Sequence, residues 1–172
     1  MLFLGSFPPA RHRWSMDFFY PNFINDFWRI FGLCLYGDKG RFVDEANKTF
    51  RREEIERELQ ARGIGMYDTA YEVRRTRNTA SDKDLEVVTP TDLDALLQAA
   101  PQCMTVVTTG QKATDLFAGH FHITPPKVGH YVEFAFEHRA LRLYRMPSTS
   151  RAYPLSLDRK AQQYSILFEQ LK

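Results

Sequence analysis

Residues 104–121 read MTVVTTGQKATDLFAGHF, and this stretch decides the fold class. The run MTVVT is short, apolar and rich in β-branched residues, which predicts a strand that is buried on both faces. It ends at Gly110, and a helical pattern begins at once with QKATDLF. A buried strand that passes directly into a helix is the repeating unit of folds with a parallel sheet. The stretch therefore predicts an α/β protein.

Upstream of this stretch, the sequence predicts one more strand and three helices. Residues 2–5 form a short apolar run that stops at the loop sequence GSFPP. A stripe of apolar side chains with helical spacing begins at Asn25, which is placed to cap the helix, and ends at Gly37. A highly charged helix is expected over 51–62, and another follows Thr91, its expected cap.

The remaining segments complete the topology. Residues 64–70 are expected to form a short buried segment, and 72–84 are polar and expected to be mostly loop. Two strands are expected over 131–136 and 140–146. The connection between them is too short for a crossover, so this pair is antiparallel. The last helix is expected over 157–171.

These elements predict a three-layer α/β/α sandwich around a mostly parallel, four-stranded central sheet. The 172 residues fit a single domain, 1–172, at roughly 100–200 residues per domain. A net charge of +2 and an aromatic content of 14% exclude a disordered tail and a strongly cationic coat protein. They leave room for a nucleic-acid enzyme whose basic residues are grouped on one face.

The cysteines and the chain start bear on the compartment. Cys34 and Cys103 lie in separate apolar stretches, which is typical of buried, inert thiols in a reducing environment. No run reaches the roughly 18 apolar residues of a membrane span, and the start lacks the basic region of a signal peptide. We therefore expect a cytoplasmic protein. Because the chain opens inside an apolar run, we also expect natural residues to precede it.

Three strand ends carry loops that suit polar ligands: GSFPP at 5–9, TTGQKA at 108–113 and MPSTSRAY at 146–153. Ligands bind at the carboxyl ends of strands in open parallel sheets, so we expect the loops to face one crevice. Backbone N–H groups and hydroxyls there suit a phosphate. Each loop alone is equally open to a plainer interpretation, as a turn, a solvated Lys112 or ordinary helix capping. The scattered histidines predict no metal site.

The aromatic stretch FFYPNFINDFWRIFG spans residues 18–32. Most of its rings are expected in the core. Tyr20 and Asn25 have a second interpretation as parts of a pocket. An aromatic ring on a loop stacks on a planar base, and an Asn amide both donates and accepts hydrogen bonds.

Five motifs, in order, resemble the uracil-DNA glycosylase superfamily, most closely its mismatch-specific and hypoxanthine-DNA glycosylase branch. GSFPP at 5–9 is similar to GSMPG, and FYPNFINDFW at 19–28 to YYAHPxNRFW. GIGMYD at 63–68 is similar to GIALWD, TGQKA at 109–113 to NGxKA, and MPSTSRAY at 146–153 to LPSTSPAN. The resemblance covers nearly the whole chain. It implies a mostly parallel sheet between helices and hydrolysis of the bond between a damaged base and deoxyribose, without metal or cofactor.

The resemblance also implies roles for single residues. Asn25 matches the catalytic residue, and Tyr20 matches the aromatic that stacks on the base. Arg151 has two interpretations, filling the gap left by a flipped base or lying solvated at a rim. The other predicted residues bind the base (Gly5, Ser6 and Phe7) or DNA (Lys112, Ser148, Thr149, Ser150 and Arg151).

The sequence departs from the resemblance at several places. Phe7 stands where the uracil and mismatch enzymes carry an Asp or Asn that activates water, and Asn22–Phe23 replace His-Pro. Asp26 replaces an Arg, and Arg151 replaces a Pro. Without a carboxylate in the first motif, Asn25 can only orient the water, and backbone N–H groups must stabilise the leaving base.

The sequence therefore predicts a monomeric, monofunctional DNA glycosylase of base excision repair, nucleoid-associated, that flips uracil or hypoxanthine out of DNA and leaves an abasic site. Two alternatives stay open. The first is a catalytically silent lesion-binding protein of the same fold, and the second is another phosphate- or nucleoside-binding α/β enzyme. DNA binding is expected to use three basic groups: 11–13, 74–77, and Arg145 with Arg151.

Overall fold

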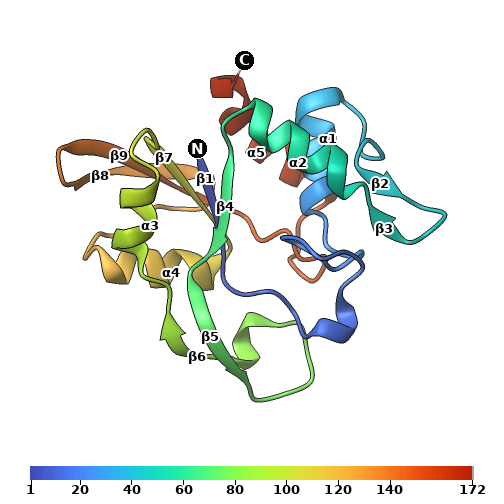
Figure 1. Cartoon of the computed structure of the whole chain (residues 1–172), viewed down its shortest axis with the longest axis horizontal. Helices are drawn as coiled ribbons and strands as arrows, with labels where there is room; N and C mark the ends of the chain where they lie inside the picture. The colour runs from blue at the N-terminus through green and yellow to red at the C-terminus, as the bar shows by residue number, and fades with distance from the viewer. Residues whose placement is uncertain (172) are drawn as a thin grey trace. The chain divides into compact units, whose positions relative to one another are not determined.

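The computed structural model describes residues 1–171, and the chain divides into two compact units. The sheet unit consists of Met1–Pro8 and Gly65–Met146. The helical unit consists of Pro9–Ile64 and Pro147–Lys172. Each unit is described by itself, and Figure 1 shows the course of the chain through both. The expectation of a single domain stays a prediction.

The sheet unit is built on a five-stranded sheet with the order β4-β1-β7-β9-β8. Strands β4, β1, β7 and β9 run parallel, and β8 pairs antiparallel with β9. The α/β class and the mostly parallel sheet are confirmed, with one strand more than the four expected. The strands are β1 (Leu2–Gly5), β4 (Gly65–Asp68), β7 (Thr105–Thr109), β8 (His130–Phe136) and β9 (Arg139–Met146).

The additional strand is β4, which lies where a short buried segment was expected. Its side chains alternate between exposed and half-buried because it is an edge strand. Central β7, by contrast, has four of its five residues buried, as its sequence predicts. Two helices, α3 (Leu93–Ala99) and α4 (Gln111–His120), contribute to one buried cluster with the sheet. Its fully buried members include Leu97, Phe117 and Leu143. Burying each such side chain stabilises the fold by about 1.5–3 kcal/mol.

The segment after β4 corrects the expectation for 72–84 only at its start, because residues 72–75 belong to a strand, whereas 76–84 contain no strand, as expected. The segment forms β5 (Ala70–Arg75) and β6 (Leu85–Pro90), an antiparallel pair with an irregular register. Most side chains of these two strands are exposed or half-buried. The sequence therefore lacks the alternation of apolar and polar residues from which a half-buried strand is predicted. A short 3-10 turn, η2 (Asp82–Asp84), lies between the two strands.

The expected cap of α3 is also corrected. Asp92 caps the helix, and its Oδ1 accepts from Ala95 N–H at 3.0 Å. The Thr91 hydroxyl instead donates to the carbonyl oxygen of Asp68, at 2.6 Å.

The helical unit contains α1 (Phe27–Tyr36), α2 (Arg52–Ala61) and α5 (Leu157–Phe168), with a small β2–β3 hairpin (Val43–Asp44 and Thr49–Phe50). The 3-10 turns η1 (Arg11–Arg13) and η3 (Glu169–Leu171) complete it. Helix α1 packs on α5, where the rings of Phe31 and Phe168 lie edge to face at 4.8 Å. As expected, Gly37 ends α1, in the left-handed conformation with φ 66° that glycine adopts readily. No helix within residues 1–171 is long and apolar enough to cross a membrane.

The carboxyl ends of the four parallel strands lie at the same end of the sheet. In the parallel register, Gly5 of β1 is the partner of Asp68 of β4, and Thr109 of β7 is the partner of Met146 of β9. The first-motif loop leaves the sheet from this end, and α4 begins directly after β7. In open parallel sheets, ligands bind at the carboxyl ends of the strands.

Candidate functional site

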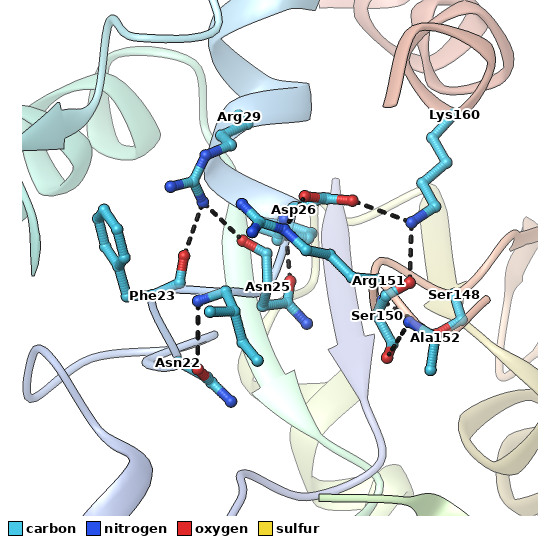
Figure 2. A network of polar contacts seen from close by, with 12 residues as sticks. Asn22, Phe23, Asn25, Asp26, Arg29, Ser148, Ser150, Arg151, Ala152 and Lys160 are labelled. Atoms are coloured by element: carbon cyan, nitrogen blue, oxygen red, sulfur yellow. Dashed lines mark hydrogen bonds and ion pairs between the residues drawn. The ribbon is translucent and has the colours of Figure 1, made fainter. Parts of the chain in front are cut away.

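The segment Asn22–Asp26 leads into α1 and is clamped by a buried arginine (Figure 2). Arg29 Nη1 donates to the carbonyl oxygens of Phe23, at 2.7 Å, and Asn25, at 3.1 Å. Its guanidinium also lies over the Phe23 ring, 4.7 Å from the centroid. Burial, and next the charge of Arg151, lowers the pKa of Arg29 from its usual value. In the sequence, the position of the charged Arg29 within the apolar stripe of α1 is the feature that could have indicated this clamp.

Asn25 lies one residue before the N-cap of α1, which is Asp26. Its side-chain Oδ1 accepts from the backbone N–H of Phe27, the first residue of α1, at 2.9 Å, and so satisfies one of the free N–H groups at the start of the helix. The side chain is half-buried. No partner for Nδ2 is found within the described residues 1–171. The amide therefore keeps N–H donors that can orient a water molecule or a base.

Tyr20 is held in an uncommon conformation beside α1. Its φ is 50°, which an aromatic residue rarely adopts, at a cost on the order of 1–3 kcal/mol. The ring stacks face to face on Phe27, with centroids 3.7 Å apart and planes 3° from parallel. Backbone strain of this kind is concentrated at ligand clamps and active sites. Lys48, His122 and Glu137 have similar φ values, so a functional role for Tyr20 stays a prediction.

The loop that follows β9 is organised by its own hydroxyls. Ser148 Oγ accepts from Ser150 N–H, and Ser150 Oγ accepts from Ala152 N–H, both at 3.2 Å. Such local bonds fix turns without using the hydroxyl hydrogens, which remain available to donate to a phosphate oxygen. Thr149 differs because it is buried, and its carbonyl oxygen accepts from the backbone N–H of Asp26 at 3.0 Å.

Asp26 joins this loop to the start of α1, as Figure 2 shows. Its Oδ1 bonds Arg151 Nε at 3.1 Å, and its Oδ2 bonds Lys160 Nζ at 3.0 Å. Lys160 also donates to the carbonyl oxygen of Ser150, at 2.8 Å. Asp26 and Arg151, two positions at which the sequence departs from the motifs that it resembles, are therefore bonded to each other.

Lys160 and the role of Asp26 were not predicted from the sequence. Lys160 of α5 is fully buried, at 0% exposure, and its only sequence signal is a charge on the inner face of a helix. Nearby, the buried Tyr164 hydroxyl donates to the carbonyl oxygen of Pro147, at 2.7 Å. These buried bonds fix the loop's backbone at both ends.

In the sheet unit, the first-motif loop is braced by the β5–β6 segment. Ser6 Oγ donates to Asp82 Oδ1 at 2.7 Å, and Arg75 Nη2 donates to the carbonyl oxygen of Pro8 at 2.8 Å. Gly5 and Ser6 are buried, and Phe7 is half-buried. The loop therefore has a fixed conformation, which suits a backbone that must present N–H groups to a ligand.

Lys112 and most of the basic groups are engaged within the protein. Lys112 Nζ donates to the carbonyl oxygen of Leu85 at 2.7 Å, so its predicted contact with DNA would require it to leave that partner. Arg11 pairs with Asp17 at 2.9 Å. Arg145 bonds Gln111 and the carbonyl oxygen of Pro126. Arg74 is exposed.

One further carboxylate was missed by the sequence reasoning. Asp68 ends β4 and is the register partner of Gly5 in the first motif. The sequence placed it at the end of the motif GIGMYD without a role. Within residues 1–171, no group of three or more His, Cys, Asp or Glu side chains is arranged to hold a metal ion. Of the neighbouring histidines, His120 is the last residue of α4, and His122 lies beyond its C-cap residue, Phe121.

The sequence matches no family model and no curated protein. Among solved structures, the chain is similar to the solution NMR structure of a "putative Uracil DNA glycosylase" from Methanosarcina acetivorans. The two share 20% identity with a TM-score of 0.60, over 99% of this chain and 89% of the other. At this identity the likeness concerns the fold, and it agrees with the resemblance to the uracil-DNA glycosylase superfamily. The superfamily and the branch within it stay predictions.

Proposed function

We propose that the protein is a DNA glycosylase that hydrolyses the bond between a deaminated base and deoxyribose. The observation that carries the proposal is the Asn25 amide. Its Oδ1 accepts from the Phe27 N–H at the start of α1, and its Nδ2 has no partner within residues 1–171. The strained Tyr20–Phe27 stack lies in the same unit. The likeness in fold supports the proposal.

Each of these groups has a separate role in the proposed reaction. A base inside a duplex must be flipped into a pocket before its sugar bond can be attacked. Tyr20 stacks on the flipped base, and Asn25 orients the attacking water. Ser148 and Ser150 donate to the DNA backbone. The backbone N–H groups around Gly5 and Ser6, in a braced loop, stabilise charge on the leaving base. The proposal includes a monomer in the cytoplasm, associated with the nucleoid.

A catalytically silent lesion-binding protein is the second candidate, and Phe7 favours it. This residue occupies the position where the uracil and mismatch enzymes carry an Asp or Asn that activates water. Such a protein would keep the stacking and backbone contacts and lack the hydrolytic step.

A gel assay separates the two candidates. Duplexes containing uracil, hypoxanthine or mismatched thymine are incubated with the protein, treated with alkali to cut abasic sites, and also run in a native gel. We expect strand cleavage with uracil or hypoxanthine and none with the undamaged duplex. A band shift specific for the damaged duplex without cleavage would identify a binder. If the protein produces no cleavage and no damage-specific shift, the result contradicts DNA as the substrate.

DNA binding is expected to weaken steeply with salt. With about three phosphate contacts, raising the salt from about 50 to about 200 mM lowers the affinity about 40-fold, because each contact releases counterions. Fluorescence anisotropy with a labelled duplex measures this dependence. We expect few phosphate contacts because many of the arginines already have partners in the protein. An affinity that does not change with salt would exclude binding through the DNA backbone.

A further inference from the structure

Asp82 lies in the turn between β5 and β6 and bonds a residue of the first-motif loop. Its Oδ1 accepts from Ser6 Oγ at 2.7 Å, across 76 residues of sequence. Ser6 is buried and Asp82 is half-buried, so water competes little for this bond. The Asp82 main chain is fixed within η2, where its carbonyl oxygen accepts from the N–H of Leu85. The loop thus has a side-chain anchor in its own unit.

The bond decides what Ser6 can offer to a ligand. Its hydroxyl group has one hydrogen, and that hydrogen is directed at Asp82. The Ser6 side chain is therefore no donor for a base or a phosphate. Within residues 1–171, the backbone N–H groups of Ser6 and Phe7 have no hydrogen-bond partner. The donors of the loop are on its backbone, and their directions depend on how the loop is held.

The loop is held at three points. The Ser6 carbonyl oxygen accepts from the N–H of Ala70 at 3.1 Å, and the Pro8 carbonyl oxygen accepts from Arg75 Nη2 at 2.8 Å. The third point is the bond from Ser6 to Asp82. No other residue of 5–8 has a polar side chain. This bond is therefore the side-chain hydrogen bond that fixes this part of the loop.

We propose that Asp82 is a positioning residue: through the Ser6 hydroxyl, it holds the first-motif loop in the conformation in which its backbone N–H groups meet the leaving base. The inference rests on the proposed function, in which these N–H groups stabilise charge on the base as its bond to deoxyribose breaks. Asp82 itself does not touch the substrate. Its loss should therefore slow the breaking of that bond and leave the binding of DNA nearly unchanged.

Asp82 also acts on a neighbouring carboxyl group through its charge. Burial first, and then the negative charge of Asp82, raises the pKa of Asp68 from 3.8 to about 7. Asp68 ends β4 beside Gly5 in the parallel register. Removing Asp82 thus removes both the acceptor for Ser6 and a charge near Asp68. Asparagine separates the two effects, because its Oδ1 still accepts from the Ser6 hydroxyl while the charge is gone.

The test measures the single-turnover rate of base excision with enzyme in saturating excess, on the duplex that the wild type cuts. A displacement of about 1 Å can cost about 100-fold in rate; because the loop keeps its other bonds, we expect Asp82→Ala to lose about tenfold. The dissociation constant for the duplex should change less than about threefold. Asp82→Asn should stay within about threefold of the wild type in rate, because it keeps the bond to Ser6. An unfolded fraction of enzyme does not alter a saturating rate, so a merely structural role would leave it unchanged.

Ser6→Ala and a double variant identify the route of the effect. Ser6→Ala should lose as much as Asp82→Ala, and the two changes together should lose no more than either alone, because both remove the same bond. The matched control is Glu72→Ala. Glu72 also accepts from a hydroxyl, that of Thr89 at 3.0 Å, in the same pair of strands, and this bond does not reach the first motif. The control should change neither rate nor affinity.

Amide hydrogen exchange followed by NMR supplies a readout that needs no activity. The N–H of Ala70 is bonded to the Ser6 carbonyl oxygen, so its exchange rate reports how firmly the loop is held. It should exchange about tenfold faster in Asp82→Ala and in Ser6→Ala than in the wild type, since each variant loses a hydrogen bond to a charged group. Asp82→Asn and Glu72→Ala should exchange like the wild type.

Several results would overturn the inference. A saturating rate for Asp82→Ala within about threefold of the wild type would show that Asp82 positions nothing that the reaction uses. Equal losses in Asp82→Asn and Asp82→Ala would assign the effect to the charge near Asp68. Losses that multiply in the double variant would show that Asp82 and Ser6 act independently. If the wild type excises no base, the proposed function fails and the role of Asp82 in it fails too, whereas the exchange of Ala70 still decides whether Asp82 holds the loop.

Discussion

Replacing Asn25 with serine is expected to lower the rate of base excision at least about 100-fold while α1 still begins at the same residue. The Asn25 side chain has two separable functions. Its Oδ1 caps α1 by accepting from Phe27 N–H, and its Nδ2 has no partner within residues 1–171. A serine hydroxyl can also accept from the backbone N–H two residues further on, so Asn25→Ser keeps the first function and removes the second. Loss of one positioned donor typically costs 10²–10³-fold in rate. Single-turnover kinetics on the duplex that the wild type cuts measures this loss.

Asn25→Ala is the companion variant, because it removes both functions. It should lose the same activity and, in addition, about 1 kcal/mol of stability from the missing cap. Both variants should bind damaged duplex within a fewfold of the wild type, since stacking and backbone contacts remain. If Asn25→Ser excises the base within a fewfold of the wild type, the amide has no part in the reaction. If Asn25→Ser unfolds like Asn25→Ala, the two functions have not been separated, and the kinetic comparison loses its meaning.

The parts of the fold that could be predicted are those encoded locally. The β7–α4 stretch, the α1 stripe and the antiparallel β8–β9 pair each carry a hydrophobic period within a few residues. The β5–β6 pair does not, because both of its faces are largely exposed and its register is irregular. The edge strand β4 was missed for a related reason. Its strand character comes from pairing with β1, more than 60 residues earlier in the chain, rather than from its own sequence.

The candidate site divides in the same way. The cap formed by Asn25 is a bond between residues two positions apart, and it could be predicted. The bonds from Asp26 to Arg151 and Lys160 span 125 and 134 residues. A local sequence pattern cannot indicate a bond between residues so far apart in the chain. Asp26 and Arg151 were therefore interpreted only as departures from the motif. Asp68 shows a further limit, because its raised pKa depends on burial and on Asp82, neither of which a single sequence displays.

Replacing Asp26 with asparagine is expected to lower the free energy of unfolding by about 3 kcal/mol or more, a large fraction of the stability of a small protein. The size of the effect comes from Lys160. Its side chain is 1% exposed, and apart from Asp26 the partner of its ammonium within the described residues is the neutral carbonyl oxygen of Ser150. Removing one partner of a buried ion pair leaves an uncompensated charge, which is more costly than losing the attraction alone. Urea unfolding followed by far-UV circular dichroism measures the difference.

Two further variants identify Lys160, rather than Arg151, as the source of that loss. Arg151 is 51% exposed, so Arg151→Ala should cost less than about 1 kcal/mol even though it removes a bond to the same carboxylate. Asp26→Asn combined with Lys160→Met removes both buried charges and should recover most of the stability that the single change loses, because the methionine fills the same space without a charge. If the double variant were as unstable as Asp26→Asn, the loss would come from the loop geometry that Asp26 supports. In that case Asp26 would act mainly through its side-chain bond to Arg151, and the stability of α1 would depend on the loop after β9 rather than on a buried charge.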